Sequence, residues 1–294
     1  MPTEWRQFVM NLESIEADLV EAVLLGHGAH SVTLTDAGDN PVLEPAPGET
    51  PLWNETRVTG LFDAGTDFKA LNVDLKRVLE LEELPPNHVE ILADRAWERE
   101  WLKDFGPMRF GRRLWVIPGD HAIPSEDAVV VRLDPGLAFG TGTHPTTALC
   151  LEWLDTIDVL DKTVFDFGCG SGVLGVAACK LGALFVEGTD IDLQAVTASR
   201  QNALRNQVED RLTATQTIPD DSGPFDIVIA NILAGTLIEN ASFIADKVKM
   251  GGALALSGVL SEQAGEVMTA YQEWFDFEPP AIKDNWARLT GKRR

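Results

Sequence analysis

The sequence of 294 residues predicts an α/β protein with two domains: an N-terminal α+β domain of the ferredoxin-like kind and a larger Rossmann-like domain. In residues 1–94, segments with strand and helix periodicity follow one another in the order βαββαβ. In residues 126–294, short apolar runs alternate with longer helical segments, which is the pattern of βαβ units around a parallel sheet. Residues 95–125 lie between the two domains and are predicted to form a linker helix and a lead-in strand.

The elements of the N-terminal domain follow from hydrophobic spacing. Residues 5–12 alternate like a strand, and residues 13–27 carry apolar side chains at helical spacing that ends at Gly26 and Gly28. The same reasoning predicts further strands at residues 29–36, 55–62 and 88–92 and a second helix at residues 66–82. This domain contains no cysteine and its histidines are scattered, so nothing in it indicates a catalytic site.

The segment between the domains carries Trp97, Trp101 and Phe105 at a spacing of four residues. This spacing predicts a helix with one aromatic stripe, which we expect to pack on a neighbouring domain rather than to bind a ligand. Strands are predicted at residues 109–118 and 128–133, at the entrance to the larger domain.

A loop rich in glycine and threonine, Phe-Gly-Thr-Gly-Thr-His-Pro-Thr-Thr at residues 139–147, then runs into a helix predicted at residues 145–157. Capping by Thr143 and the fit of Pro145 to a first helical turn explain part of this loop. They do not explain the phenylalanine and the other glycines and threonines, so the loop is also a candidate lid over a bound ligand. His144 is interpreted as a turn residue rather than a base, although its pKa range permits both.

The most informative stretch is the glycine-rich turn that follows the strand predicted at residues 163–167. Gly168, Gly170 and Gly172 leave bare backbone before the helix predicted at residues 173–181, so a ligand can lie against its amides. The next strand, residues 184–189, delivers Asp190 about 20 positions after the glycines, where nucleoside-binding folds hold ribose hydroxyls. The sequence therefore predicts an enzyme with a nucleoside cofactor.

Two classes of cofactor, a dinucleotide and S-adenosylmethionine, are consistent with this turn. Residues 170–175 match the dinucleotide fingerprint G-x-G-x-x-G, which is weak evidence by itself. Asp166 lies near the end of the predicted strand, just before the glycines, and its negative charge disfavours a pyrophosphate. The same charge favours the sulfonium and ammonium of S-adenosylmethionine, and the order of acid, glycines and second acid resembles class I methyltransferases.

The remaining segments continue the α/β alternation: helices at residues 193–206, 234–249 and 262–274, and strands at 211–216, 226–230 and 252–258. Asn231 falls at the carboxyl end of one strand, beside the expected topological switch point, where it is either a turn former or a contact to the acceptor. Residues 275–292 predict an antiparallel hairpin around Asp284 and Asn285. Such a hairpin closes a seven-stranded methyltransferase sheet, whereas a dinucleotide domain ends on a parallel strand.

Composition narrows the possible partners. The chain has 46 acidic and 24 basic residues and a net charge of −22, which repels phosphate backbones and attracts basic proteins. A general solubility or salt adaptation is the alternative explanation. No apolar run is long enough for a membrane span, the N-terminus lacks signal-peptide features, and three cysteines without metal-ligand spacing suit a reducing cytosol. Cys169, inside the glycine turn, is interpreted as a small spacer.

Four motifs together closely resemble the methyltransferases of ribosomal protein L-eleven (L11), and the resemblance covers the whole chain. They are the loop at residues 139–147, Asp-Phe-Gly-Cys-Gly-Ser-Gly at 166–172, Asp-Ile-Asp at 190–192 and Ala-Asn-Ile-Leu-Ala-Gly at 230–235. The first and last are specific to that family, and the middle two are shared by most class I methyltransferases.

The resemblance implies a cytoplasmic enzyme that transfers methyl groups from S-adenosylmethionine to the α-amine and lysine ε-amines of L11. It also implies that the N-terminal domain recognises the substrate. Asn231 is the predicted catalytic residue, and no metal site, membrane contact or direct nucleic-acid binding is expected. The predicted cofactor site consists of Phe139, Thr141, Gly142, Thr147, Asp166, Gly168, Gly170, Asp190 and Asn231.

The sequence departs from the broader amino-methyltransferase signature Asn-Pro-Pro-Tyr, because Ile232, Leu233 and Ala234 follow Asn231. Without an aromatic residue to stack on a planar base, the site fits an aliphatic amine acceptor. Two other readings stay open at this point: a methyltransferase for a nucleic acid or small molecule, and a non-catalytic or nicotinamide-binding protein.

Overall fold

The chain divides into two compact units, Met1–Arg99 and Glu100–Arg294. The computed structural model describes residues 5–12, 17–38, 55–92, 106–119, 121–123, 125, 127–133, 144–219 and 222–294. The predicted linker helix, which carries Trp97 and Trp101, lies outside the described residues.

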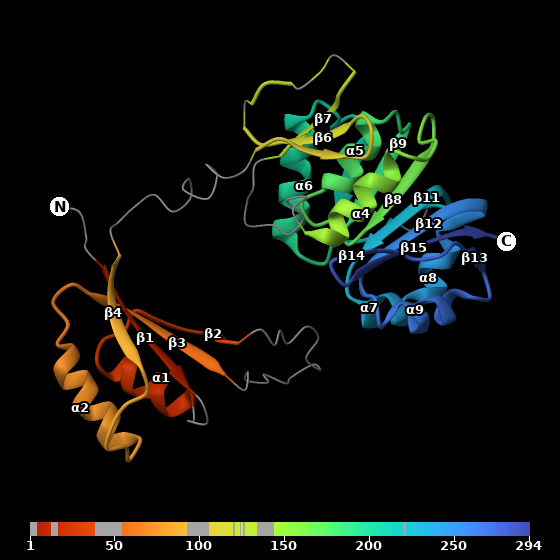
Figure 1. Cartoon of the computed structure of the whole chain (residues 1–294). Helices are drawn as coiled ribbons and strands as arrows, with labels where there is room; N and C mark the ends of the chain where they lie inside the picture. Colours follow the sequence, from red (N-terminus) through yellow and green to blue (C-terminus); the bar gives the residue numbers. More distant parts are fainter. Residues whose placement is uncertain are drawn as a thin grey trace. The chain divides into compact units, whose positions relative to one another are not determined.

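The first unit is a four-stranded antiparallel sheet with two helices (Figure 1). The sheet order is β2-β3-β1-β4, so the two central strands are the first of each βαβ half, and the predicted ferredoxin-like order is confirmed. Its elements are β1 (Trp5–Leu12), α1 (Ala17–Gly26), β2 (Ser31–Asp36), β3 (Thr56–Asp63), α2 (Phe68–Val78) and β4 (Asn87–Leu92).

Alternation along the central strands builds the core of this unit. Phe8, Met10 and Leu12 of β1 are buried in one cluster with Leu24 of α1 and Leu75 of α2. Residues two apart on a strand share a face, so these side chains turn toward the helices while their neighbours face away. The unit therefore has a core of its own.

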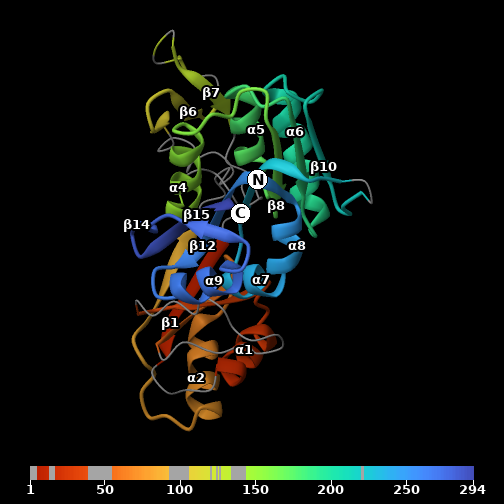
Figure 2. The same cartoon turned by 90° about the vertical axis from the view of Figure 1, so that its right-hand side faces the viewer.

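The second unit is a three-layer α/β/α domain around a mixed sheet, ordered β10-β9-β8-β11-β12-β15-β13 (Figures 1 and 2). The strands β8 to β12 are parallel, and β15 is antiparallel to β12, as the sequence predicts for a class I methyltransferase. The bounds are β8 (Thr163–Phe167), α5 (Val173–Lys180), β9 (Phe185–Thr189), α6 (Leu193–Arg205), β10 (Leu212–Thr215), β11 (Phe225–Asn231), α7 (Ala234–Glu239), α8 (Ala241–Asp246), β12 (Val248–Leu260), α9 (Ala264–Tyr271), β13 (Phe275–Phe277), β14 (Ala281–Lys283) and β15 (Trp286–Arg293).

Strand β11 shows how the sheet buries both faces. Ile227 and Ile229 pack into the cluster that includes α5, α6 and α4 (Pro145–Leu154). Val228 and Ala230 pack into the opposite cluster with α7, α8 and α9. A continuous apolar run is what a central parallel strand requires, because neither of its faces meets water.

Two predicted elements are wrong in detail, and a third, the closing hairpin, is confirmed only in part. Residues 109–118 form two antiparallel strands, β5 (Met108–Phe110) and β6 (Leu114–Ile117), joined by a turn, and not one strand. The helix predicted at 234–249 breaks at Asn240, which ends α7 and begins α8, because an asparagine side chain competes with the helical backbone.

The closing hairpin around Asp284 and Asn285 is confirmed, but the strand before it is split into β13 and β14, which both pair with β15. Pro279 and Pro280 lie in the gap, and proline cannot donate a ladder hydrogen bond. The sheet therefore has eight strands rather than the seven that the sequence predicts.

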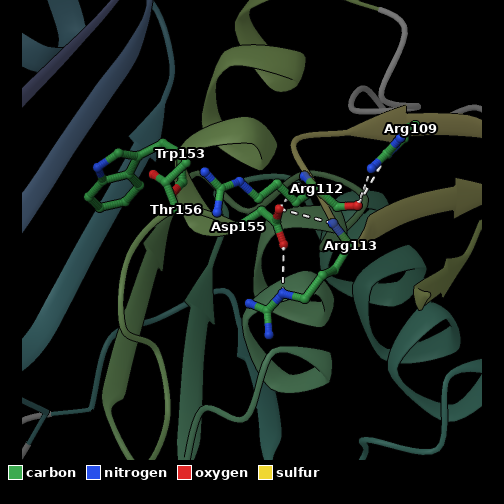
Figure 3. Close-up of polar contacts among 6 residues, drawn as sticks. All are labelled: Arg109, Arg112, Arg113, Trp153, Asp155 and Thr156. Carbon is green, nitrogen blue, oxygen red and sulfur yellow. Dashed lines mark hydrogen bonds and ion pairs between the residues drawn. The ribbon is translucent and has the colours of Figure 1, made fainter. Parts of the chain in front are cut away.

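A small second sheet, in which β6 also pairs with β7 (Val129–Arg132), is tied to the end of α4 by Asp155 (Figure 3). The side chain of Asp155 is fully buried, and its Oδ2 accepts the backbone N–H groups of Arg112 at 2.5 Å and Arg113 at 3.1 Å. The Arg113 guanidinium lies 3.4 Å from Oδ1. One carboxylate therefore fixes the β5–β6 turn against the helix that enters the candidate site.

Candidate functional site

The glycine turn lies at the carboxyl end of β8, where β9 and β11 flank that strand. The N–H groups of Gly168 and Cys169 both donate to the carbonyl of Thr189, at 2.8 and 2.9 Å, and this holds the turn against β9. Gly168 has φ +75°, and a Cβ on it would lie 2.3 Å from Cγ2 of Ile232. Only glycine fits there, and the close approach brings the turn beside the segment that carries Asn231.

Asp190 follows β9 at the same edge of the sheet. Its Oδ2 accepts the Gly170 N–H at 2.9 Å, and its Oδ1 accepts the Asp192 N–H at 3.0 Å. A carboxylate has about four acceptor positions, so each oxygen can still accept a ribose hydroxyl. The residue is partly exposed, which leaves it accessible to a ligand on the turn.

Asp166 lies inside the sheet, with 1% of its surface exposed. Its Oδ2 accepts the Gly175 N–H at 3.0 Å, whereas its buried Oδ1 has no hydrogen-bond partner among the described residues. The pKa of this carboxyl is raised to about 7, mainly because burial disfavours the charged form; the Gly175 N–H acts to lower the pKa and the nearby Asp190 charge to raise it. A cation placed near Oδ1 would stabilise its ionised form.

Asn231 ends β11, and Thr147 lies in the first turn of α4. The Asn231 Nδ2 donates to the Thr147 Oγ1 at 3.3 Å. The Asn231 Oδ1 is buried and has no partner in the described part of the chain. The strand end therefore presents one oriented amide oxygen beside the glycine turn.

His144 begins α4 as its N-cap, a position that we predicted for Thr143. Its Nδ1 lies 2.7 Å from the Thr146 Oγ1, and its ring contacts Trp286 edge-on with centroids 4.8 Å apart. Burial lowers its pKa, so the ring is neutral near pH 7. The sequence reasoning missed Trp286, because the aromatic residue that meets this helix comes from the closing hairpin.

Three predicted cofactor residues, Phe139, Thr141 and Gly142, lie outside the described residues. Cys169 does lie in the turn, but burial raises the pKa of its thiol to about 12. Its thiol is protonated near pH 7 and is not a nucleophile, in agreement with its interpretation as a spacer.

These residues fit S-adenosylmethionine better than a dinucleotide. Two buried acceptor oxygens, Asp166 Oδ1 and Asn231 Oδ1, lack hydrogen-bond partners among the residues that the structure describes, and both belong to neighbouring strands at the glycine turn. Unpaired buried acceptors call for donors or cations, which an ammonium and a sulfonium supply and a pyrophosphate does not. Asp190 provides acceptors for ribose hydroxyls on the other side of the turn.

Comparison with known proteins agrees with this geometry. Residues 4–294 match the family model of ribosomal protein L11 methyltransferase (PrmA). The chain is 54% identical to the protein of that name from Aeromonas hydrophila, over 98% of this chain and 99% of the relative, and 52% identical to that of Shewanella denitrificans, over 99% of each.

Among solved structures, a ribosomal protein L11 methylase from Lactobacillus delbrueckii subsp. bulgaricus is similar with a TM-score of 0.60 and 32% identity, covering 65% of this chain and all of that one. The chain belongs to the ribosomal protein L11 methyltransferase family of S-adenosylmethionine-dependent enzymes.

Proposed function

We propose that this protein transfers methyl groups from S-adenosylmethionine to the α-amine and the lysine ε-amines of ribosomal protein L11, and that Asn231 aims the acceptor amine. The observation that carries the proposal is the buried, unpartnered Oδ1 of Asn231, which lies beside the glycine turn at the carboxyl edge of the sheet. Membership of the family supports L11 as the substrate. The position of the Asn231 amide supports the role proposed for that residue.

The chemistry requires a neutral amine, because only the lone pair of a neutral amine can attack a methyl group. A lysine amine with a reference pKa near 10.4 is mostly protonated at pH 7, and an α-amine near 7.8 is less so. S-adenosylmethionine supplies the electrophilic methyl group. Asn231 accepts an N–H of the amine through Oδ1, which leaves the lone pair free to point along the line of attack.

The acids of the site serve binding rather than proton transfer. Asp190 offers its carboxylate to the ribose hydroxyls, and Asp166 offers its ionised form to the cationic end of the cofactor. No described side chain at the strand ends combines a suitable pKa with contact to Asn231, so we assign the loss of the amine proton to water.

The N-terminal unit is proposed to recognise the substrate. Residues 1–105 carry 21 acidic and 8 basic residues, which complements a basic ribosomal protein. No helix in the described ranges is long and apolar enough to cross a bilayer. We propose the cytoplasm, where ribosomal proteins are made, as the place of action.

The substrate is tested by incubating the full-length protein with labelled S-adenosylmethionine and a mixture of unmodified ribosomal proteins and ribosomal RNA. Mass analysis should find the label on amines of L11. Label on RNA, or on other proteins with L11 left unmodified, would overturn the proposed substrate.

The role of Asn231 is tested with Asn231→Ala in single-turnover methylation at saturating cofactor. The rate constant should fall by about 10-fold or more while the Kd for S-adenosylmethionine changes less, because the aligned geometry matters chiefly in the transition state. Asn240→Ala is the matched control, since among the described residues that side-chain amide donates to the Thr236 carbonyl of α7 and not to a residue of the site. A parental rate constant for Asn231→Ala would remove this residue from the mechanism.

A further inference from the structure

The glycine turn is held by a side chain of α6. The Asn202 Nδ2 donates to the Ser171 carbonyl at 2.8 Å, across 31 positions of the sequence. A carbonyl oxygen can only accept, so this contact fixes the orientation of the amide: its nitrogen, and not its oxygen, must face the turn. Asn202 therefore binds the turn from α6, independently of the bonds that the turn makes to β9 and Asp190.

The turn needs such support because its glycines leave the backbone free to rotate. Gly168, Gly170 and Gly172 have φ of +75°, +53° and +76°, a region that glycine enters about as readily as its mirror image. No side chain at these positions selects the direction of a peptide plane, so hydrogen bonds must do so. The peptide between Ser171 and Gly172 has one such bond inside the turn, through its N–H at 2.8 Å, and a second from α6 through its carbonyl.

The same face of α6 carries the contacts that seat the helix. Ser199 is fully buried, and a Cβ on Gly172 would lie 2.3 Å from its Oγ, so the helix packs directly against the turn. The Asn206 side chain accepts the Arg132 N–H at 2.7 Å and donates to the Arg132 carbonyl at 2.8 Å, which ties α6 to β7. Ser199, Asn202 and Asn206 share one face because they are three and four residues apart. The amide that holds the turn thus projects from a helix that is itself fixed.

Fixing this peptide matters for binding because the turn offers its backbone to the cofactor. Gly172 is the N-cap of α5 and makes no side-chain capping bond, so the direction of the amides that follow it depends on the conformation of the turn. A flexible surface must be ordered when a ligand binds, and the cost of ordering is subtracted from the affinity. The loss of Asn202 should therefore weaken binding without changing the methyl-transfer step.

We propose that Asn202 is a positioning residue for S-adenosylmethionine: from α6 it holds the Ser171 carbonyl and so orders the glycine turn before the cofactor binds. It acts through the turn rather than by touching the cofactor. The inference rests on the proposed binding of the cofactor at the glycine turn, and it is independent of the role of Asn231 and of the acceptor.

The test compares variants of Asn202 with a variant of Asn206 in the full-length protein. Asn202→Leu keeps nearly the same shape and loses the amide, and Asn202→Ala is a second variant should leucine disturb the packing. Asn206→Ala is the matched control, an asparagine on the same face of α6 whose side chain holds β7 instead of the turn. The calorimetric Kd for S-adenosylmethionine, the single-turnover rate constant at saturating cofactor and the free energy of unfolding in urea are measured for each.

The Asn202 variants should raise the Kd by about 3- to 10-fold, as expected for the loss of one neutral hydrogen bond, while the rate constant at saturating cofactor stays within about 2-fold of the parent. Asn206→Ala should lower the free energy of unfolding and leave the Kd within about 2-fold. Hydrogen exchange without cofactor should separate the two positions. A peptide that covers the glycine turn should exchange faster in the Asn202 variants, and one that covers β7 should exchange faster in Asn206→Ala.

The outcomes that contradict this inference differ from the one that contradicts the site. If the Asn202 variants bind the cofactor with the parental Kd while Asp190→Ala binds it more weakly, the cofactor site stands and Asn202 does not position it. If Asn206→Ala raises the Kd as much as Asn202→Ala does, the effect comes from a loosened α6 and the inference is wrong. A rate constant that falls as far as the affinity would also overturn it. If Asp190→Ala keeps the parental Kd as well, the proposed cofactor site itself is wrong, and the inference with it.

Discussion

Two acids of the same type lie in different surroundings in this site, and we propose different roles for them on that ground. Asp190 is partly exposed and accepts the N–H groups of Gly170 and Asp192, so it supports the turn and leaves acceptor positions open to a ligand. Asp166 is buried with a single N–H partner for its two oxygens. This difference in environment, rather than residue type, is why we propose that Asp190 binds the ribose and Asp166 a cation.

Asp190→Ala should weaken the binding of S-adenosylmethionine by about 10- to 100-fold, since it removes charge-assisted hydrogen bonds worth roughly 1.5–3 kcal/mol. Calorimetry of the folded variant measures the effect. Asp158→Ala is a suitable control, because within the described part of the chain Asp158 is a turn residue whose carboxylate accepts the Leu160 N–H. A Kd equal to that of the parent would show that Asp190 does not hold the ribose.

Asp166 should make cofactor binding depend on pH. Its pKa in the free protein is raised to about 7, so much of it is protonated below that pH, and binding of a cation must release the proton. The affinity should therefore rise with pH and level off above the raised pKa, by about 10-fold between pH 6 and pH 8. Calorimetry across this range, with Asp166→Asn to subtract the titration of the ligand itself, provides the measurement; identical pH profiles in the two proteins would contradict the assignment.

At the scale of elements, the site depends on how α4 is held. Its first turn carries Thr147, and its carboxyl end is fixed to the β5–β6 turn by Asp155, as Figure 3 shows. The Asp155 carboxylate is itself fully buried and accepts two backbone N–H groups, so it contributes more than a surface ion pair. The small sheet is thus part of the support of the site and not a detachable lead-in.

Asp155→Ala should destabilise the second unit by about 2–4 kcal/mol, because two backbone N–H groups lose a charged acceptor. Hydrogen exchange of the Arg112 and Arg113 amides should accelerate accordingly. Asp246→Ala is the control: Asp246 is 74% exposed, and its ion pair with Arg293 should contribute less than about 1 kcal/mol. Unchanged exchange at the two arginine amides would show that the carboxylate does not hold the turn.

At the scale of the whole molecule, the predicted cofactor site and the densest acidic charge lie in different parts of the chain. Every described residue of the predicted cofactor site belongs to the second unit, whereas residues 1–105 hold a denser excess of acid. Long-range attraction between an acidic surface and a basic protein raises the association rate, and salt screens it beyond about 8 Å at physiological ionic strength.

A chain that begins at Arg95 should bind S-adenosylmethionine with the parental Kd, provided that circular dichroism shows it folded, and should lose methylation of intact L11. In the full-length protein, the association rate with L11 should fall as salt rises. If the folded truncation methylates L11 at the full-length rate, the N-terminal unit is not the recognition element, and its acidity is a surface adaptation.

The sequence alone determined the local features of this protein and the order in which they occur. The spacing of apolar residues identified the βαββαβ unit and the alternating strands and helices of the second unit. A helix or strand that buries one face repeats its apolar residues at the period of that element. The glycine turn, Asp166 and Asp190 were recognisable because bare backbone, a strand-end acid and their separation form one local unit, residues 163–192. Asn231 could be placed at the correct sheet edge because parallel strands end together.

Only the tertiary structure decided which side chains meet across the chain. The contact of Thr147 with Asn231, the packing of Trp286 on His144 and the anchoring of Arg112 by Asp155 join residues from separate elements. Periodicity reports which face of an element is buried, but not which residue of another element lies opposite, because that depends on how helices and strands pack in three dimensions. The family of this enzyme could therefore be identified from its motifs, whereas these contacts between separate elements required the fold.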